Sequence, residues 1–144
     1  MENMAELGFR PIEFKGSCLC GGVCFTGHGL RDVVYCHCGQ CRAGHGAIAA
    51  YSATEFSKLI LTKQDTLRWY NASSVARRGF CMKCGGNLFW EPVEGPMISI
   101  AAGALDQTAG LRGAGHIYVT DKAPYDEISD HLPRFLGSMY VQEW

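Results

Sequence analysis

Seven of the eight cysteines in this chain stand in three short groups, and their spacing constrains the fold more than any other feature. The groups are C-x-C, C-H-C-x-x-C and C-x-x-C, formed by Cys18 and Cys20, by Cys36, Cys38 and Cys41, and by Cys81 and Cys84. The N-terminus shows no basic segment followed by an apolar one, so we expect no signal peptide and a cytoplasmic location. Because disulfides do not persist in a reducing cytosol, clustered cysteines there more often bind metal. We therefore predict metal sites.

The first and last groups together predict a closed site. A C-x-x-C turn followed by glycine presents two sulfurs on one side of a tight loop, which is half of the tetrahedron that structural zinc needs. The C-x-C pair can supply the other half, because alternate residues of an extended segment face the same way. We predict a four-cysteine zinc site, formed by Cys18, Cys20, Cys81 and Cys84, that staples the start of the chain to its middle.

The middle group, Cys36, Cys38 and Cys41, then has three sulfurs and no fourth cysteine in its motif. Three protein ligands and a vacant position are typical of a catalytic or ligand-binding zinc. The chain is thus predicted to hold two zinc ions, one structural and one open. In the alternative, the second cluster is also structural and is closed by a histidine or by Cys24.

Four residues are candidates near this vacancy. His45 stands four residues after Cys41, so in a helical turn the two side chains share a face, and the ring could coordinate zinc, carry a proton or simply face solvent. His37 lies between two ligands, and in an extended stretch its ring points away from the metal, toward substrate or supporting residues. We expect Cys24 to be a packed or surface thiol, and His116 to be packed or solvated.

Length and charge restrict the class of protein. A chain of 144 residues fits one domain with a real core, which we place at 12–136 between tails at 1–11 and 137–144. Lys and Arg number 13 against 14 Asp and Glu, which argues against broad adhesion to nucleic acid or anionic membrane. No apolar run approaches the roughly 20 residues of a membrane-spanning helix. The oligomeric state has no signal in the sequence.

Short β segments dominate the pattern, because 18 glycines divide the chain into pieces rich in β-branched and aromatic residues. The predicted strands are Ile12–Ser17, Gly22–Thr26, Val33–Tyr35, Ala47–Ser52, Ile60–Thr62, Leu67–Asn71, Val75–Phe80, Leu88–Glu91, Met97–Ala101 and Ile117–Val119. Short helical turns are predicted at Gly39–Gly44, Ala53–Lys58 and Ile128–Leu132. The fold class is therefore a mainly β, mostly antiparallel small domain with a few short helical turns.

With these groups in order, the sequence resembles the glutathione-dependent formaldehyde-activating enzyme family, whose domain also occurs in centromere protein V. The matching motifs run in family order from about Ile12 to Phe135, and they are G-S-C-L-C-G-G-V, C-H-C-G-Q-C-R, R-R-G-F-C-M-K-C-G-G-N-L, A-G-A-L-D, H-I-Y-V-T-D-K-A-P-Y and L-P-R-F. The resemblance implies a mainly β zinc-binding fold like that of a small guanine-nucleotide-exchange chaperone. It also implies the same division of the cysteines into a structural and a reactive zinc site.

The resemblance implies an activity as well: joining formaldehyde to glutathione to give S-hydroxymethylglutathione, a carbon–sulfur lyase reaction running in reverse. This chain departs from the family pattern at three positions. His45 replaces a small or hydroxyl residue, Cys24 replaces a basic or small polar one, and Tyr125 replaces a tryptophan. These departures concern the substrate rather than the fold.

Zinc chemistry favours a thiol as the substrate. Coordination removes the thiol proton, and a zinc that already carries three thiolates holds a further thiolate better than it activates water. An aldehyde beside that thiolate could be attacked at carbon, with His37 or His45 moving the proton. Arg42, Arg77 and Arg78 could bind the two carboxylates of glutathione, unless they are ordinary solvated charges. The competing function is a zinc-stapled module that binds protein or nucleic acid without catalysis.

Overall fold

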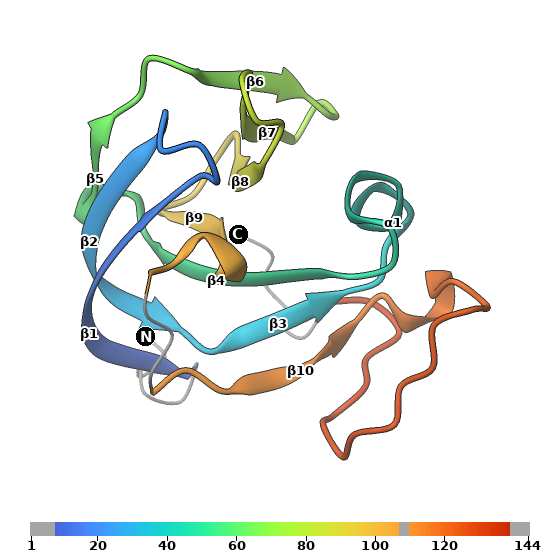
Figure 1. Cartoon of the computed structure of the whole chain (residues 1–144). Coiled ribbons are helices and arrows are strands. Elements are labelled where there is room, and N and C mark those ends of the chain that lie inside the picture. The colour runs from blue at the N-terminus through green and yellow to red at the C-terminus, as the bar shows by residue number, and fades with distance from the viewer. Residues whose placement is uncertain (1–7, 107–109, 139–144) are drawn as a thin grey trace.

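A computed structural model describes residues 8–106 and 110–138 of the chain (Figure 1). Its strands are β1 (Phe9–Ser17), β2 (Cys24–Arg31), β3 (Val33–Cys36), β4 (Ala49–Glu55), β5 (Leu59–Lys63), β6 (Leu67–Asn71), β7 (Ala76–Cys81), β8 (Asn87–Pro92), β9 (Met97–Ala101) and β10 (Gly113–Ile117). Its helices are α1 (Gly39–His45) and the short 3₁₀ helices η2 (Phe56–Lys58), η3 (Ala102–Ala104) and η4 (Val119–Asp121). The predicted fold class, mainly β with short helical turns, is confirmed.

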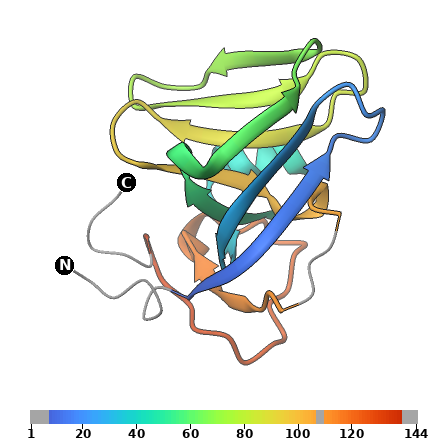
Figure 2. The ribbon, with the colours of Figure 1, turned by 90° about the vertical axis from the view of Figure 1, so that its left-hand side faces the viewer.

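The strands form two sheets. A three-stranded antiparallel sheet has the order β1-β2-β5, and a seven-stranded sheet has the order β10-β3-β4-β9-β8-β7-β6. All pairs in the larger sheet are antiparallel except β10 with β3, which is parallel. Figure 2 shows the smaller sheet crossing the strands of the larger one obliquely.

The core fills the space between the two sheets. Phe25 of β2 meets Phe89 of β8 edge to face, with ring centroids 5.4 Å apart, and Leu30, Ile98 and Ile100 are buried with them. Aromatic and branched side chains at alternate positions turn one face of each strand inward, and their burial provides the main stabilisation of the fold. Among the described residues no helix is long and apolar enough to cross a membrane.

Three sequence predictions for local structure are wrong. Residues 53–55 of the predicted helix Ala53–Lys58 continue β4, where Ala53 pairs with Ser99 of β9, and only Phe56–Lys58 is helical. The final strand is Gly113–Ile117 rather than Ile117–Val119, because this glycine-rich segment gains its partner from β3, far away in the sequence. Ile128–Leu132 is not helical, since the Asp130 side chain accepts the Leu132 amide and forms a local turn.

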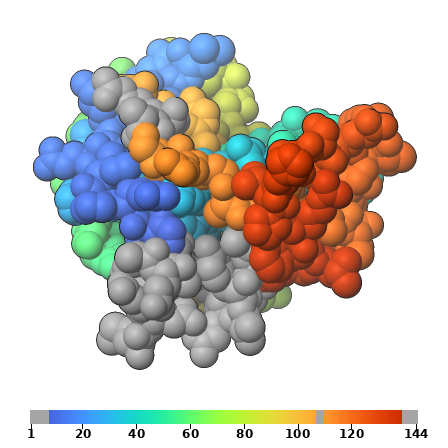
Figure 3. All heavy atoms as spheres, turned by 90° about the horizontal axis from the view of Figure 1, so that it is seen from below, coloured from blue at the N-terminus to red at the C-terminus, as the bar shows by residue number. Residues whose placement is uncertain are grey.

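The segment after β10 folds back over β3 and β10. The amides of Tyr118 and Val119 donate to the carbonyls of Gly137 and Phe135, at 3.0 and 3.2 Å. Figure 3 shows this C-terminal part of the described chain, in red, gathered on one side of the molecule. It lies beside the edge strand β10, where His116 pairs with Arg134, and β10 in turn pairs with β3, which ends at Cys36.

Candidate metal centres and the adjoining cavity

Four cysteines from two turns of the chain, β1–β2 and β7–β8, lie close together. The sulfurs of Cys18, Cys20, Cys81 and Cys84 lie within 4.8 Å of one another. Two of the separations are 3.7 Å, for Cys18 and Cys20, and 3.5 Å, for Cys20 and Cys81. A zinc tetrahedron with Zn–S bonds near 2.3 Å has S–S edges of about 3.8 Å, so this donor set fits zinc. The predicted grouping of these four cysteines is seen in the structure.

The local backbone geometry favours the thiolate form of these cysteines. Gly21 and Gly85 directly follow the two cysteine pairs with φ of +77° and +73°, which favours glycine and turns the chain under the sulfurs. The Cys81 Sγ accepts the amides of Lys83 and Cys84 at 3.4 and 3.5 Å. Such amide donors stabilise negative charge on sulfur.

The second cluster comprises Cys36, Cys38 and Cys41, whose sulfurs also lie within 4.8 Å of one another. Cys36 ends β3, Cys38 caps α1, and Cys41 lies in the first turn of that helix. The Cys38 Sγ accepts the Cys41 amide at 3.4 Å. Three thiols without a fourth cysteine fit a thiolate-bound metal such as zinc with one position open.

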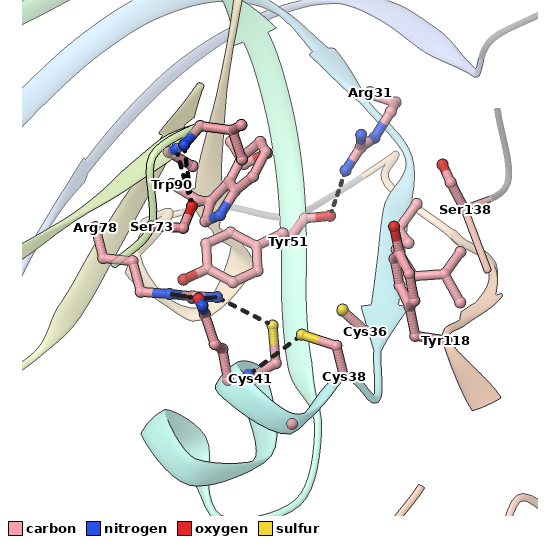
Figure 4. Close-up of a pocket in the computed structure, with 17 residues that line it drawn as sticks. Arg31, Cys36, Cys38, Cys41, Tyr51, Ser73, Arg78, Trp90, Tyr118 and Ser138 are labelled. Atoms are coloured by element: carbon pink, nitrogen blue, oxygen red, sulfur yellow. Dashed lines mark hydrogen bonds between the residues drawn. The ribbon is translucent and has the colours of Figure 1, made fainter. Parts of the chain in front are cut away.

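These sulfurs face a cavity of about 400 Å³, which is within the range of small-molecule sites. Its walls combine the three cysteines with apolar and aromatic side chains, including Val34, Tyr51, Trp90 and Tyr118. Figure 4 shows the sulfurs on one side of the cavity, with Tyr51, Trp90 and Arg78 beside them. The three-cysteine cluster therefore opens onto a partly enclosed space.

The three arginines predicted to bind substrate are separated by the fold. Arg78 of β7 lines the cavity, and its Nη2 donates to the Cys41 Sγ at 3.6 Å and to Gln40 Oε1 at 3.3 Å. Arg77 is the next residue on the strand and points elsewhere, where it pairs with Glu91 at 3.0 Å and covers the Trp69 ring. Arg42 lies in α1 and is not among the residues that line the cavity.

His45 ends α1 and reaches Tyr51, not the cysteine sulfurs. Its Nε2 lies 3.3 Å from the Tyr51 hydroxyl, and the two rings meet edge to face. Burial, followed by the nearby Arg78 charge, lowers the pKa of His45. The ring is therefore a neutral neighbour of the cavity wall.

His37 is buried behind the cysteine loop and belongs to a chain of polar groups. Its Nε2 lies 2.8 Å from His116 Nδ1, and His116 Nε2 lies 2.9 Å from Asp130 Oδ2. The other ring nitrogen of His37 is 3.5 Å from Asp126. Burial, together with the charge of His116, lowers the pKa of His37. His37 does not line the cavity; instead it joins β3 to the C-terminal segment.

The cavity also contains residues that sequence reasoning missed. Tyr51 and Trp90 lie in none of the motifs, and Tyr118 lies in one without a predicted role. Each reaches the site through strand pairing or chain reversal rather than through spacing along the chain. Cys24, by contrast, stays outside both clusters and donates its thiol hydrogen to the Gly21 carbonyl.

The sequence and the fold are both similar to those of known proteins. Residues 13–121 match a family described as glutathione-dependent formaldehyde-activating enzyme. A crystal structure of a protein from Rhodobacter sphaeroides is similar, with a TM-score of 0.56 and 25% identity over 69% of this chain and 97% of that chain. No curated protein matches the sequence.

Proposed function

Because the chain belongs to the glutathione-dependent formaldehyde-activating enzyme family, we propose that it joins a small aldehyde to a thiol, as an S-(hydroxymethyl)glutathione synthase-like carbon–sulfur lyase. The observation that carries this proposal is the position of Cys36, Cys38 and Cys41 on the wall of the cavity. A purely structural cluster has no need of an adjoining space.

The two clusters would have different roles. Zinc at Cys18, Cys20, Cys81 and Cys84 would hold the fold together. Zinc at the three-cysteine cluster would hold an incoming thiol in its thiolate form, which is the nucleophilic form. The rest of the chemistry depends on the side chains around the cavity.

Those side chains suit an anionic thiol and a small carbonyl compound. Arg78 places a cation beside the Cys41 sulfur, where it would bind a carboxylate of glutathione and offset the negative charge of the cluster. Apolar walls such as Val34 and Trp90 reduce the access of water to the reacting atoms. His45, predicted as a proton carrier, would reach the cavity only through its contact with the Tyr51 hydroxyl. His37 would act only as a support, because its ring is buried away from the cavity.

Glutathione and zinc-bound cysteines both need conditions that keep thiols reduced, and the cytosol provides them. We therefore propose a cytoplasmic location for this reaction. Arg42 and Arg77, which lie outside the cavity wall, would have no direct part in binding the substrate.

Direct measurement of binding and rate tests the proposal. Zinc-loaded protein is titrated with glutathione by calorimetry, and adduct formation with formaldehyde is followed by exchange NMR. We expect saturable binding and a rate above the uncatalysed reaction, both lost in Cys38→Ser. Wild-type protein that binds zinc but neither glutathione nor the adduct would instead support a zinc-stapled module that binds protein or nucleic acid.

A further inference from the structure

Tyr51 occupies a rigid position in the cavity wall. It lies on β4, inside the larger sheet, with Val34 of β3 and Ala101 of β9 as its strand partners. Its side chain is 7% exposed and packs with Cys41, while Trp90 borders the same cluster. A group held on a central strand keeps its geometry better than one on a loop.

The Tyr51 hydroxyl is a polar group near two basic side chains, one of which contacts the cysteine cluster. It lies 3.3 Å from His45 Nε2, and the Arg78 guanidinium, which contacts the Cys41 sulfur, also acts on it electrostatically. A tyrosine hydroxyl both donates and accepts hydrogen bonds, and with an ordinary pKa of about 10 the phenol keeps its hydrogen at neutral pH. Ser73, another hydroxyl of the described cavity wall, instead accepts the amides of Val75 and Ala76 in a surface loop.

We propose that the Tyr51 hydroxyl donates a hydrogen bond to the aldehyde oxygen while the carbon–sulfur bond forms, and that His45 orients this hydroxyl. This inference rests on the proposed function. The neutral His45 ring would carry its hydrogen on Nε2 and donate it to the Tyr51 oxygen, which leaves the phenolic hydrogen directed to the substrate. Tyr51 is then a catalytic residue and His45 a positioning residue.

The reaction balances with these groups. The thiol releases its proton to solvent on binding, and its sulfur electron pair forms a bond to the aldehyde carbon. The carbonyl π pair moves to oxygen, where the Tyr51 hydroxyl stabilises the developing negative charge, as donors in an oxyanion hole do. The oxygen then takes a proton from solvent, so thiol and aldehyde give the hydroxymethyl thioether without any oxidant or reductant.

The test uses the zinc-loaded full chain and Tyr51→Phe, which removes only the hydroxyl. Tyr70→Phe is the matched control, because Tyr70 lies on the edge strand β6, is 63% exposed and does not line the cavity. Calorimetry measures the affinity for glutathione alone and for glutathione with excess formaldehyde, and exchange NMR measures the rate of adduct formation.

We expect wild type to bind glutathione more tightly with excess formaldehyde than without it. Tyr51→Phe should keep its zinc and bind glutathione alone within about twofold of wild type, but should lose this preference for the adduct. Its rate should fall by about 100-fold, the typical effect of removing one such donor. His45→Gln should lower kcat with little change in KM, and the double variant should be no slower than Tyr51→Phe, because the two residues act as one unit.

Other outcomes overturn the inference. If wild type is active and Tyr51→Phe keeps both its rate and its preference for the adduct, the hydroxyl has no role, while the proposed function stands. If Tyr51→Phe loses zinc or glutathione affinity, its role is structural. If wild-type protein neither binds glutathione nor forms the adduct, the inference fails together with the proposed function.

Discussion

At the scale of single residues, neighbours in the sequence have different surroundings. Arg77 and Arg78 are adjacent on β7, yet only Arg78 reaches the cavity, because successive side chains of a strand point to opposite faces. His37 similarly sits between two cysteines of the cluster while its ring lies among His116 and Asp126. Roles at this scale follow from the direction of each side chain.

Arg78→Gln should weaken glutathione binding by roughly 10- to 100-fold, as expected from losing a charged hydrogen bond of about 1.5–3 kcal/mol. The partly buried guanidinium is the cation beside the Cys41 sulfur. Calorimetry at two salt concentrations measures the effect. Arg77→Gln is the matched control, because Arg77 pairs with Glu91 outside the cavity; equal losses in both variants would contradict a specific role for Arg78.

His45 should be absent from the zinc coordination shell. Its Nε2 is directed to the Tyr51 hydroxyl and is not part of the sulfur cluster. X-ray absorption at the zinc edge should therefore show Zn–S distances near 2.3 Å and no imidazole contribution at 2.0–2.1 Å. The spectrum of His45→Ser should match that of wild type, and a change in that spectrum would reveal direct coordination.

At the scale of elements, each cysteine cluster joins different parts of the fold. The four-cysteine cluster joins the β1–β2 turn to the β7–β8 turn, whereas the three-cysteine cluster joins the end of β3 to the start of α1. The first spans segments that are distant in the sequence, and the second closes a short loop. The loss of a metal from the first cluster should therefore destabilise the fold more than its loss from the second.

Cys81→Ser should unfold the chain or destabilise it severely. Structural zinc contributes about 10 kcal/mol or more, which is comparable to the whole stability of a domain, and the Cys81 sulfur is fully buried. Cys38→Ser should keep the fold and lose only the second zinc. Circular dichroism and thermal melting compare the two variants; equal loss of structure in both would make the second site structural as well.

The attachment of the C-terminal segment to the sheet should depend on the hydrogen bonds of His116. His116→Phe keeps a ring beside Tyr35 but removes the bonds to His37 and Asp130, and leaves a buried nitrogen of His37 without its partner. We expect a loss of about 2–3 kcal/mol in the free energy of unfolding and faster proteolysis after residue 117. Asp130→Asn retains an acceptor and should change stability little; similar losses in both variants would contradict the buried chain of bonds.

At the scale of the whole molecule, the main apolar core lies between two sheets, and the two cysteine clusters lie at different ends of strands. Figure 1 shows α1, which carries Cys41, apart from the β7–β8 turn, which carries Cys84. The first cluster has four sulfurs, which fill a tetrahedral site, although Cys20 among them is exposed. The second opens to a cavity between the larger sheet, α1 and the C-terminal segment. The two metals should therefore differ in how easily they exchange.

Protein purified without chelator should contain close to two zinc ions per chain by elemental analysis. Mild chelation should remove one ion first, from the three-cysteine cluster, because the open position and the cavity give a chelator access. The fold should persist at that stage in circular dichroism. A single zinc that added metal cannot raise to two would contradict the two-site arrangement.

Spacing along the chain was enough to predict the metal clusters and the fold class. Cysteines two or three residues apart within one group are held together by local geometry. The need of structural zinc for four ligands paired the first group with the last, although Cys20 and Cys81 are 61 positions apart. Short, glycine-separated strands also carry their own signal. The family motifs carried the resemblance, and the match to residues 13–121 confirmed it.

Only the tertiary structure decided which other side chains join the clusters. Tyr51 meets the cysteines because β4 pairs with β3 in one register, and a shift by one residue would turn its ring to the other face. The parallel pairing of β10 with β3 likewise joins residues 80 or 81 positions apart. The chain of His37, His116 and Asp130 beside it joins residues 79 and 14 positions apart. Such pairings are set by how the sheets pack around the core, and that information is spread over the whole sequence rather than written in any one motif.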